Sequence, residues 1–181
     1  NLYAYCQNNP TYYVDPTGNA CESGKKKLKL SQDKERLEQV TKEYSDLVNS
    51  NERWSWKKDI TDGASVSLSE RAMVKQEAVK KGLIPDIKMK PGTRYPDFES
   101  SNLIKKVNYL PEDLWKKSDE AQFKWLDDNL DTTLKLEREA GLTTWHHSEI
   151  PGRMELVPYG IHNVTNHKGG RSKGHWAFGR R

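Results

Sequence analysis

The residues best suited to chemistry lie at the C-terminal end of the chain, where its histidines are concentrated. All five follow residue 143, at His146, His147, His162, His167 and His175. A neutral imidazole binds metal ions, and a pKa close to neutrality also lets histidine take a proton from water. Residues 143–181 carry six Lys and Arg against two Glu. A basic, histidine-rich segment of this kind favours metal-assisted chemistry on a phosphate group.

The same segment has the pattern of two strands and a short helix. Pro151-Gly152 predicts a turn between the strand that carries His146-His147 and a second strand, and Gly169-Gly170 predicts the end of the helix that follows. This order of elements is that of a ββα metal finger. Adjacent strand residues point to opposite faces, so one histidine of the pair can hold a cation while its neighbour contacts a water molecule.

The two downstream histidines can share a metal ion only under one condition. Five residues turn a regular helix by about 500°, which leaves His162 and His167 about 140° apart, so the helix must end between them. Asn166 is the alternative to His167 as a ligand, and His175 is not expected to bind the ion. Four nearby cations either contact the phosphate backbone or serve only as surface charges: Arg153, Lys168, Arg171 and Lys173.

The residues before this segment predict mainly helices. Apolar residues recur at helical spacing between 31 and 48, and Ser67 with Glu70 has the spacing of a capping box that begins a second helix. Prolines then predict an extended connection. Further helices are predicted at 112–115, from Ser118 onward, and at 132–140, the last either separate or continuous with its predecessor. The predicted fold class is therefore α+β, a mostly helical domain with a C-terminal ββα-metal motif.

The composition limits the class of protein. The 181 residues are 34% hydrophobic and 31% charged, which predicts one modest domain with a polar extension. The longest apolar stretches fall far short of the roughly 20 residues that span a membrane, so we expect no transmembrane segment. Cys6 and Cys21 form no Cys-x-x-Cys pair, which excludes a zinc ribbon and leaves two thiols or one disulfide. The chain starts at Asn1, as an internal piece of a longer polypeptide would.

The block from Trp145 onward resembles the Trp-His-His (WHH) subgroup of the HNH/endonuclease VII superfamily. The shared motifs fall within about residues 95–178: Trp145-His146-His147, Pro151-Gly152, Met154, Leu156-Val157, His162, His167, Gly169-Gly170 and the upstream Gln122-Phe123-Lys124-Trp125-Leu126. This resemblance implies that His146 is a metal ligand and His147 the general base, with His162 and His167 at the downstream ligand positions. Many members orient the base with an Asn; Glu155 stands nearest that place here. The implied ion is Mg²⁺ or Mn²⁺, with Zn²⁺ or Ni²⁺ as alternatives.

The first residues resemble the end of the Rhs/YD-repeat core. The matching motifs are Asn1-Leu2-Tyr3-Ala4-Tyr5, Asn8-Asn9-Pro10 and Asp15-Pro16-Thr17-Gly18. In that family a β-shell encloses a variable C-terminal toxin, and an Asp-Pro-x-Gly-Leu motif marks the point of self-cleavage. Asn19 replaces the Leu of this motif here, which leaves self-cleavage at this bond open.

Together these features predict three segments: the end of the Rhs core at 1–19, a polar linker with amphipathic helices at 20–94, and a WHH nuclease toxin domain at 95–181. Because the helices of the second segment carry only narrow apolar stripes, we expect a chain that begins near Pro91 to keep its activity.

The predicted function is metal-dependent cleavage of DNA in the cytoplasm of a competitor bacterium, after delivery from the Rhs shell, with a cognate immunity protein as partner. Two alternatives stay open. One is a ribonuclease that uses the same histidines, and the other is a non-catalytic module that binds nucleic acid and is stabilised by zinc.

Overall fold

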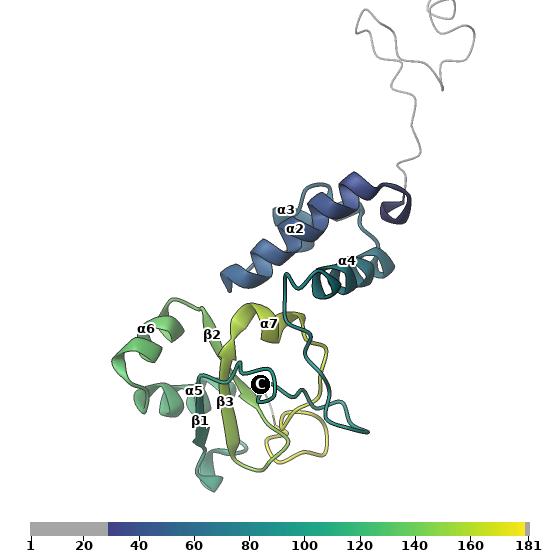
Figure 1. Cartoon of the computed structure of the whole chain (residues 1–181). Coiled ribbons are helices and arrows are strands. Elements are labelled where there is room, and N and C mark those ends of the chain that lie inside the picture. The colour runs from purple at the N-terminus through teal and green to yellow at the C-terminus, as the bar shows by residue number, and fades with distance from the viewer. Residues whose placement is uncertain (1–28, 180–181) are drawn as a thin grey trace, which may run out of the picture. The chain divides into compact units, whose positions relative to one another are not determined.

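The computed structural model describes residues 29–179. The Rhs-like motif, its possible cleavage point and both cysteines lie outside these residues. The chain divides between Leu37 and Glu38 into two compact units. The described part of the first unit contains η1 (Leu30–Gln32) and the beginning of α2 (Lys34–Ser50), where the backbone N–H of Arg36 donates to Asp33 Oδ1 at 3.0 Å. All other elements belong to the second unit (Figure 1). The predicted boundaries at residues 19 and 94 stay predictions.

The second unit begins with helices. The rest of α2 is followed by α3 (Trp56–Asp59), η2 (Gly63–Ser65) and α4 (Leu68–Lys80). The capping box predicted at α4 is confirmed, since the Ser67 side chain accepts from the backbone N–H of Glu70 and the Glu70 carboxylate accepts from that of Ser67. The buried positions of α2 after Glu38 keep the predicted helical spacing: Val40, Thr41, Tyr44, Ser45 and Val48.

Three antiparallel strands form one sheet, and two of them belong to the histidine-rich segment 143–181. They are β1 (Lys106–Tyr109), β2 (Thr143–His147) and β3 (Arg153–Pro158), in the order β1-β3-β2. The turn predicted between β2 and β3 is confirmed, and Gly152 takes the positive φ of 76° that glycine allows there. β1 was not predicted. It has only four residues, none of them buried, and it pairs with residues far along the chain.

One face of the sheet packs on two helices. These are α5 (Asp119–Asp128) and α6 (Thr132–Glu139), two separate helices joined by a short connection. A 3₁₀ turn, η3 (Glu112–Leu114), precedes α5. The core between the sheet and these helices consists of Leu110, Leu126, Trp145, Met154 and Leu156. The Trp145 Nε1–H donates to Asp127 Oδ1 at 2.8 Å, and Arg138 holds the same carboxylate through two further bonds. These contacts fix the start of the Trp-His-His motif.

The last helix, α7 (Tyr159–Val164), follows β3 directly. It ends at Val164 because Thr165 is extended, with φ −87° and ψ 109°. The prediction that Gly169-Gly170 closes this helix is therefore wrong: the backbone leaves the helix before His167. This end point meets the condition under which His162 and His167 can share one ion.

Upstream helices support α7. The backbone N–H of Gly160 donates to Asn51 Oδ1 at 3.0 Å, and Lys75 Nζ donates to the carbonyl of Val164 at 2.6 Å. A Cβ at position 160 would lie only 1.9 Å from the carbonyl oxygen of Val48, so glycine allows the close approach of α7 to the end of α2. The helix that carries His162 thus rests on residues from well before the histidine segment.

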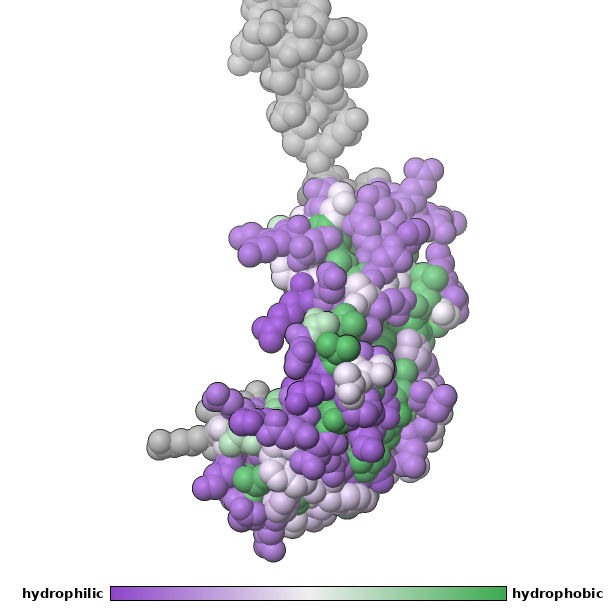
Figure 2. Space-filling model, turned by 90° about the vertical axis from the view of Figure 1, so that its left-hand side faces the viewer, coloured by the Kyte–Doolittle hydropathy of each residue, from purple (hydrophilic) through white to green (hydrophobic). Residues whose placement is uncertain are grey.

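The structure confirms the predicted α+β fold class, with helices in the N-terminal part and a β-hairpin followed by a helix at the C-terminal end. No helix of the described part is both long and apolar enough to cross a bilayer. The face shown in Figure 2 is mostly hydrophilic, with hydrophobic side chains in small groups. Exposed large apolar residues such as Leu68 and Leu136 come from different helices.

Candidate metal centre and active site

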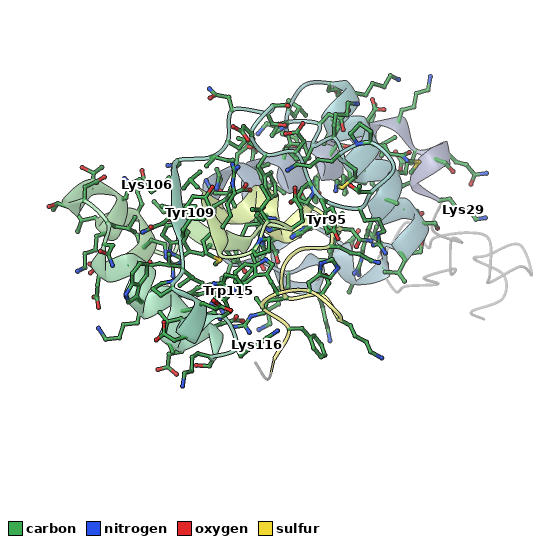
Figure 3. The ribbon with its side chains drawn as sticks, turned by 90° about the horizontal axis from the view of Figure 1, so that it is seen from below. Lys29, Tyr95, Lys106, Tyr109, Trp115 and Lys116 are labelled. Atoms are coloured by element: carbon green, nitrogen blue, oxygen red, sulfur yellow. The ribbon has the colours of Figure 1, made fainter. Side chains whose placement is uncertain are left out.

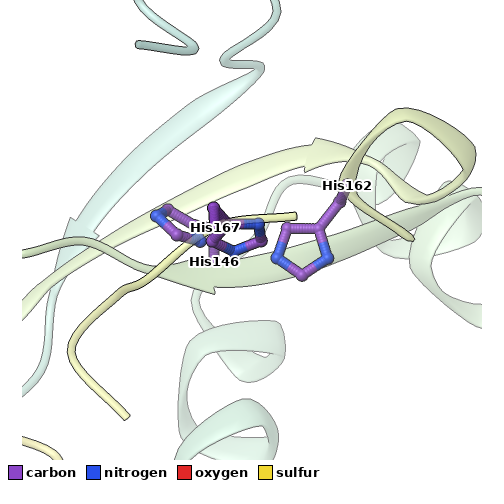
Figure 4. A group of neighbouring side chains, drawn as sticks. All are labelled: His146, His162 and His167. Atoms are coloured by element: carbon purple, nitrogen blue, oxygen red, sulfur yellow. The ribbon is translucent and has the colours of Figure 1, made fainter. Parts of the chain in front are cut away.

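Three histidines come together from a strand, a helix and a loop of the C-terminal segment. His146 lies on β2, His162 on α7, and His167 in the loop that follows α7 (Figure 4). One ring nitrogen from each lies within 4.8 Å of those of the other two. Such a cluster of imidazoles can bind one cation. Three protein nitrogens then serve as ligands, and the other coordination positions of the cation stay open for water or substrate.

Burial keeps these imidazoles neutral. It lowers the pKa of His146 well below the ordinary value of 6.5 and that of His162 to about 3, and the neighbouring histidines add to both shifts. The pKa of His167 is also lowered by burial, against an opposing effect of its hydrogen bond to the backbone at Thr165. Since a metal ion binds the neutral ring, the cluster is in the ligating form at neutral pH.

The hydrogen bond of His167 fixes which nitrogen faces the cluster. Its Nδ1 lies 2.6 Å from the carbonyl oxygen of Thr165. A carbonyl only accepts, so Nδ1 carries the proton and Nε2 carries the lone pair. A backbone carbonyl on the second nitrogen is the usual way in which proteins orient a metal-binding histidine.

Phe98 lies against all three rings of the cluster. It is 1% exposed, edge-on to His146 and His167 with ring centroids 5.2 and 6.1 Å away, and tilted to His162 at 6.2 Å. Phe98 comes from the connection between α4 and β1, where the backbone N–H of Asp97 donates to the carbonyl of Lys88. The apolar side of the histidine cluster is thus built by a residue to which the sequence analysis gave no role.

His147 opens into the same cleft from the opposite face of β2. A cavity of about 310 Å³ is lined by the three clustered histidines together with His147, Asp119 and Arg171. In the described sheet β2 is an outer strand, so side chains from its two faces reach one cleft. The loop after α7 closes one wall, where a Cβ at Gly169 would lie 2.4 Å from the carbonyl oxygen of His147. Adjacent histidines therefore serve one site.

His147 makes a close contact with Gln122 on α5. The Gln122 Oε1 lies 2.6 Å from His147 Nε2, and Gln122 is 0% exposed. Glu155, which we expected to orient the base, lies elsewhere: it pairs in register with His146, on the other face of the sheet, and its carboxylate lies 3.0 Å from Arg153 Nε. Burial raises the pKa of Glu155, and Arg153 opposes that rise. The available sequence signal was the Gln122-Phe123-Lys124-Trp125-Leu126 block, to which the sequence analysis gave no role in the site.

The four candidate phosphate contacts divide into two pairs. Arg153 lies in ion pairs with Glu99 and Glu155, at 3.2 and 3.0 Å. Arg171 pairs with Asp119 at 2.6 Å and donates to the carbonyls of two further residues, Lys117 and Ala177. Lys168 and Lys173, by contrast, are exposed on the loop beside the cleft. The two lysines are therefore better placed to meet a phosphate backbone.

Two other residues considered as ligands lie outside the cluster. Asn166 Oδ1 accepts from an Arg94 guanidinium nitrogen at 3.0 Å. The His175 ring packs edge-on to Tyr95, with ring centroids 5.6 Å apart. Both contacts tie the loop after α7 and the C-terminal residues to the connection before β1. They position the loop that carries His167.

Metal-free protein should lose stability as the pH falls below about 6.5. The pKa of His162 is ordinary in the unfolded chain and about 3 in the fold, so between these values the unfolded chain binds more protons and acid favours unfolding. A shift of this size corresponds to on the order of 5 kcal/mol over the whole window. Urea unfolding in a chelator, from neutral pH downward, measures the loss.

The matched control for this pH effect is His162→Phe, which removes one titrating ring and keeps an aromatic side chain beside Phe98. This variant should lose less stability over the same pH range than the parent protein. Equal losses in the two proteins would contradict the assignment of the pH effect to His162.

The comparison with known families agrees with this geometry. Residues 141–177 match the WHH family, described as a nuclease of the HNH/ENDO VII superfamily with conserved WHH. The matched range contains β2, β3, α7 and the loop with His167. The chain has no significant match among curated proteins or among solved structures. The match and the histidine cluster together show that the C-terminal part of this chain carries a WHH nuclease domain of the HNH/ENDO VII superfamily.

Proposed function

We propose that this protein is a toxin, a metal-dependent endonuclease that hydrolyses DNA in the cytoplasm of competitor bacteria. The observation that carries the nuclease part is the single cleft that holds three neutral imidazoles beside His147. The toxin part rests on the resemblance of residues 1–19 to the end of an Rhs core, which lies outside the described residues. Delivery from an Rhs carrier and neutralisation by a cognate immunity protein follow from the same resemblance.

The residues of the cluster fit a divalent cation. His146, His162 and His167 would hold the ion through neutral ring nitrogens, and the carbonyl of Thr165 orients the last of them. When bound, a divalent cation offsets negative charge on the phosphate and on the leaving oxygen. A donor set made only of imidazole suits Zn²⁺ or Ni²⁺ better than Mg²⁺, which prefers oxygen ligands. We therefore propose that this site prefers Zn²⁺ or Ni²⁺ to Mg²⁺.

The protein groups around the cluster divide the remaining work. His147 takes the proton from the attacking water, since it opens into the same cleft from the neighbouring position on β2. Lys168 and Lys173 hold the substrate backbone by charge, without reading bases. Arg171 keeps Asp119 and the C-terminal residues in place, because its donors are used within the protein.

Supercoiled plasmid incubated with the full chain tests the proposal. Activity should be absent in a chelator and return on addition of one of Zn²⁺, Ni²⁺, Mn²⁺ or Mg²⁺. His162→Ala should lose both metal binding, measured by calorimetry, and cleavage. His175→Ala, which changes a histidine outside the cluster, should retain both.

The alternative functions give different outcomes in the same experiment. Cleavage of a structured RNA and not of plasmid would replace the deoxyribonuclease by a ribonuclease with the same site. Metal and nucleic-acid binding without cleavage of either substrate would replace the enzyme by a zinc-stabilised binding module.

A further inference from the structure

The amide of Gln122 is fully enclosed between α5 and the turn that precedes it. Its Nε2 lies 2.8 Å from the carbonyl oxygen of Leu114, 2.9 Å from that of Trp115 and 3.2 Å from that of Lys117. Three acceptors surround this atom, so it must be the amide nitrogen, and the orientation of the amide is determined by its surroundings. The oxygen of the same amide therefore faces His147.

The position of that oxygen determines where the proton of His147 lies. Gln122 Oε1 can only accept, and it lies 2.6 Å from His147 Nε2. In the neutral imidazole one nitrogen donates and the other accepts, so Nε2 carries the proton and the lone pair lies on Nδ1. A base must present a lone pair to the water that it deprotonates.

We propose that Gln122 is a positioning residue, which holds His147 in the Nε2–H tautomer so that Nδ1 takes the proton from the attacking water. This inference rests on the proposed nuclease function for its chemistry. It assigns the orienting role to a neutral amide on α5, a different element from the hairpin that carries the histidine pair.

Asp119 is the alternative candidate for the residue that orients His147. Its Oδ1 lies 3.8 Å from His147 Nε2, too far for a hydrogen bond, whereas it lies 2.6 Å from Arg171 Nη2 and 2.7 Å from Arg171 Nε. Arg171 thus holds the nearby carboxylate. A neutral amide selects the tautomer without placing a negative charge directly on the base.

The turn that holds Gln122 is itself well anchored. Trp115 and Lys116, labelled in Figure 3, lie in the connection between β1 and α5. The Trp115 indole N–H donates to the carbonyl of Leu110 at 2.9 Å, and Arg171 Nη2 donates to the carbonyl of Lys117 at 2.8 Å. The turn whose carbonyls hold the amide is therefore itself fixed in place, which a positioning role requires.

Two substitutions separate the orienting role of Gln122 from a merely structural one. Gln122→Met removes the acceptor beside His147, whereas Gln122→Glu keeps an acceptor of the same shape. Both variants remove the amide donor of the three carbonyls, and Gln122→Met alone also removes the acceptor of His147. In the full chain, Gln122→Met should lower kcat by roughly 10²-fold with little change in KM or metal affinity. Gln122→Glu should retain clearly more activity than Gln122→Met.

Nitrogen NMR of the metal-free protein gives a readout that does not depend on cleavage. His147, identified by its absence in His147→Ala, should be protonated on Nε2 in the parent protein and lose this preference in Gln122→Met. An Nδ1–H tautomer in the parent protein would overturn the inference even if both variants failed to fold. Equal loss of activity in the two variants, with the tautomer unchanged, would also overturn it.

Asp119→Asn completes the test of the alternative candidate. It should leave the tautomer of His147 unchanged, and a changed tautomer in this variant alone would transfer the role to Asp119. An Nε2–H tautomer in a parent protein that cleaves neither DNA nor RNA would refute the proposed function and leave the structural assignment of the tautomer intact.

Discussion

His147→Ala should lower the rate of plasmid cleavage by roughly 10²- to 10⁴-fold and leave metal binding intact. The substitution removes the base but none of the three clustered ligands, because His147 lies on the face of β2 opposite His146. Single-turnover cleavage measures the rate, and calorimetric titration of the metal measures the affinity.

His146→Ala is the matched control, since it changes the neighbouring residue on the same strand. This variant should lose metal affinity together with activity. The assignment of roles within the pair is wrong if His147→Ala loses metal as severely as His146→Ala, or if it cleaves at nearly the parent rate.

A chain that begins at Pro91 should bind metal at least roughly 10-fold more weakly than the full chain and have little activity. The sequence alone led to the opposite expectation. The structure changes it because Lys75 and Asn51 hydrogen-bond to the backbone of α7, the helix that carries His162. The shortened chain also loses Lys90, whose Nζ pairs with Glu149 just after β2 at 2.5 Å. Circular dichroism and metal titration measure the two effects.

A chain that begins at Lys29 is the control for this truncation, because it keeps every described element. It should bind metal as the full chain does. Lys75→Met in the full chain tests the contact with α7 directly and should weaken metal binding without removing a ligand. A Pro91 chain with parental metal affinity would restore the view that the upstream helices are dispensable.

The features that could be predicted from the sequence are local ones. The hairpin, the capping box of α4 and the histidine motif each depend on residues close together along the chain. β1 was missed because it has only four residues and its pairing joins Lys106 to Leu156, far along the sequence. The early end of α7 was also missed, since Thr165 gives no strong stop signal.

The surroundings of the site depended on contacts that a single sequence does not reveal. Phe98 lies in a separate connection from the histidines that it touches, and Gln122 reaches His147 from another helix. The sequence likewise shows which residues are charged and not which charges are paired. Arg153 and Arg171 therefore looked equivalent to Lys168 and Lys173, until the structure showed their carboxylate partners.

Because His146 and His147 are adjacent on one strand, the role of each depends on the face of the strand to which its side chain points. A strand alternates its side chains between two faces, so a slip of β2 by one residue relative to β3 would exchange the two histidines. The residue now facing His162 and His167 would turn toward Gln122, and its neighbour would turn toward the cluster. An inserted or deleted residue within β2 would thus leave the composition of the site unchanged and exchange the roles of the two histidines.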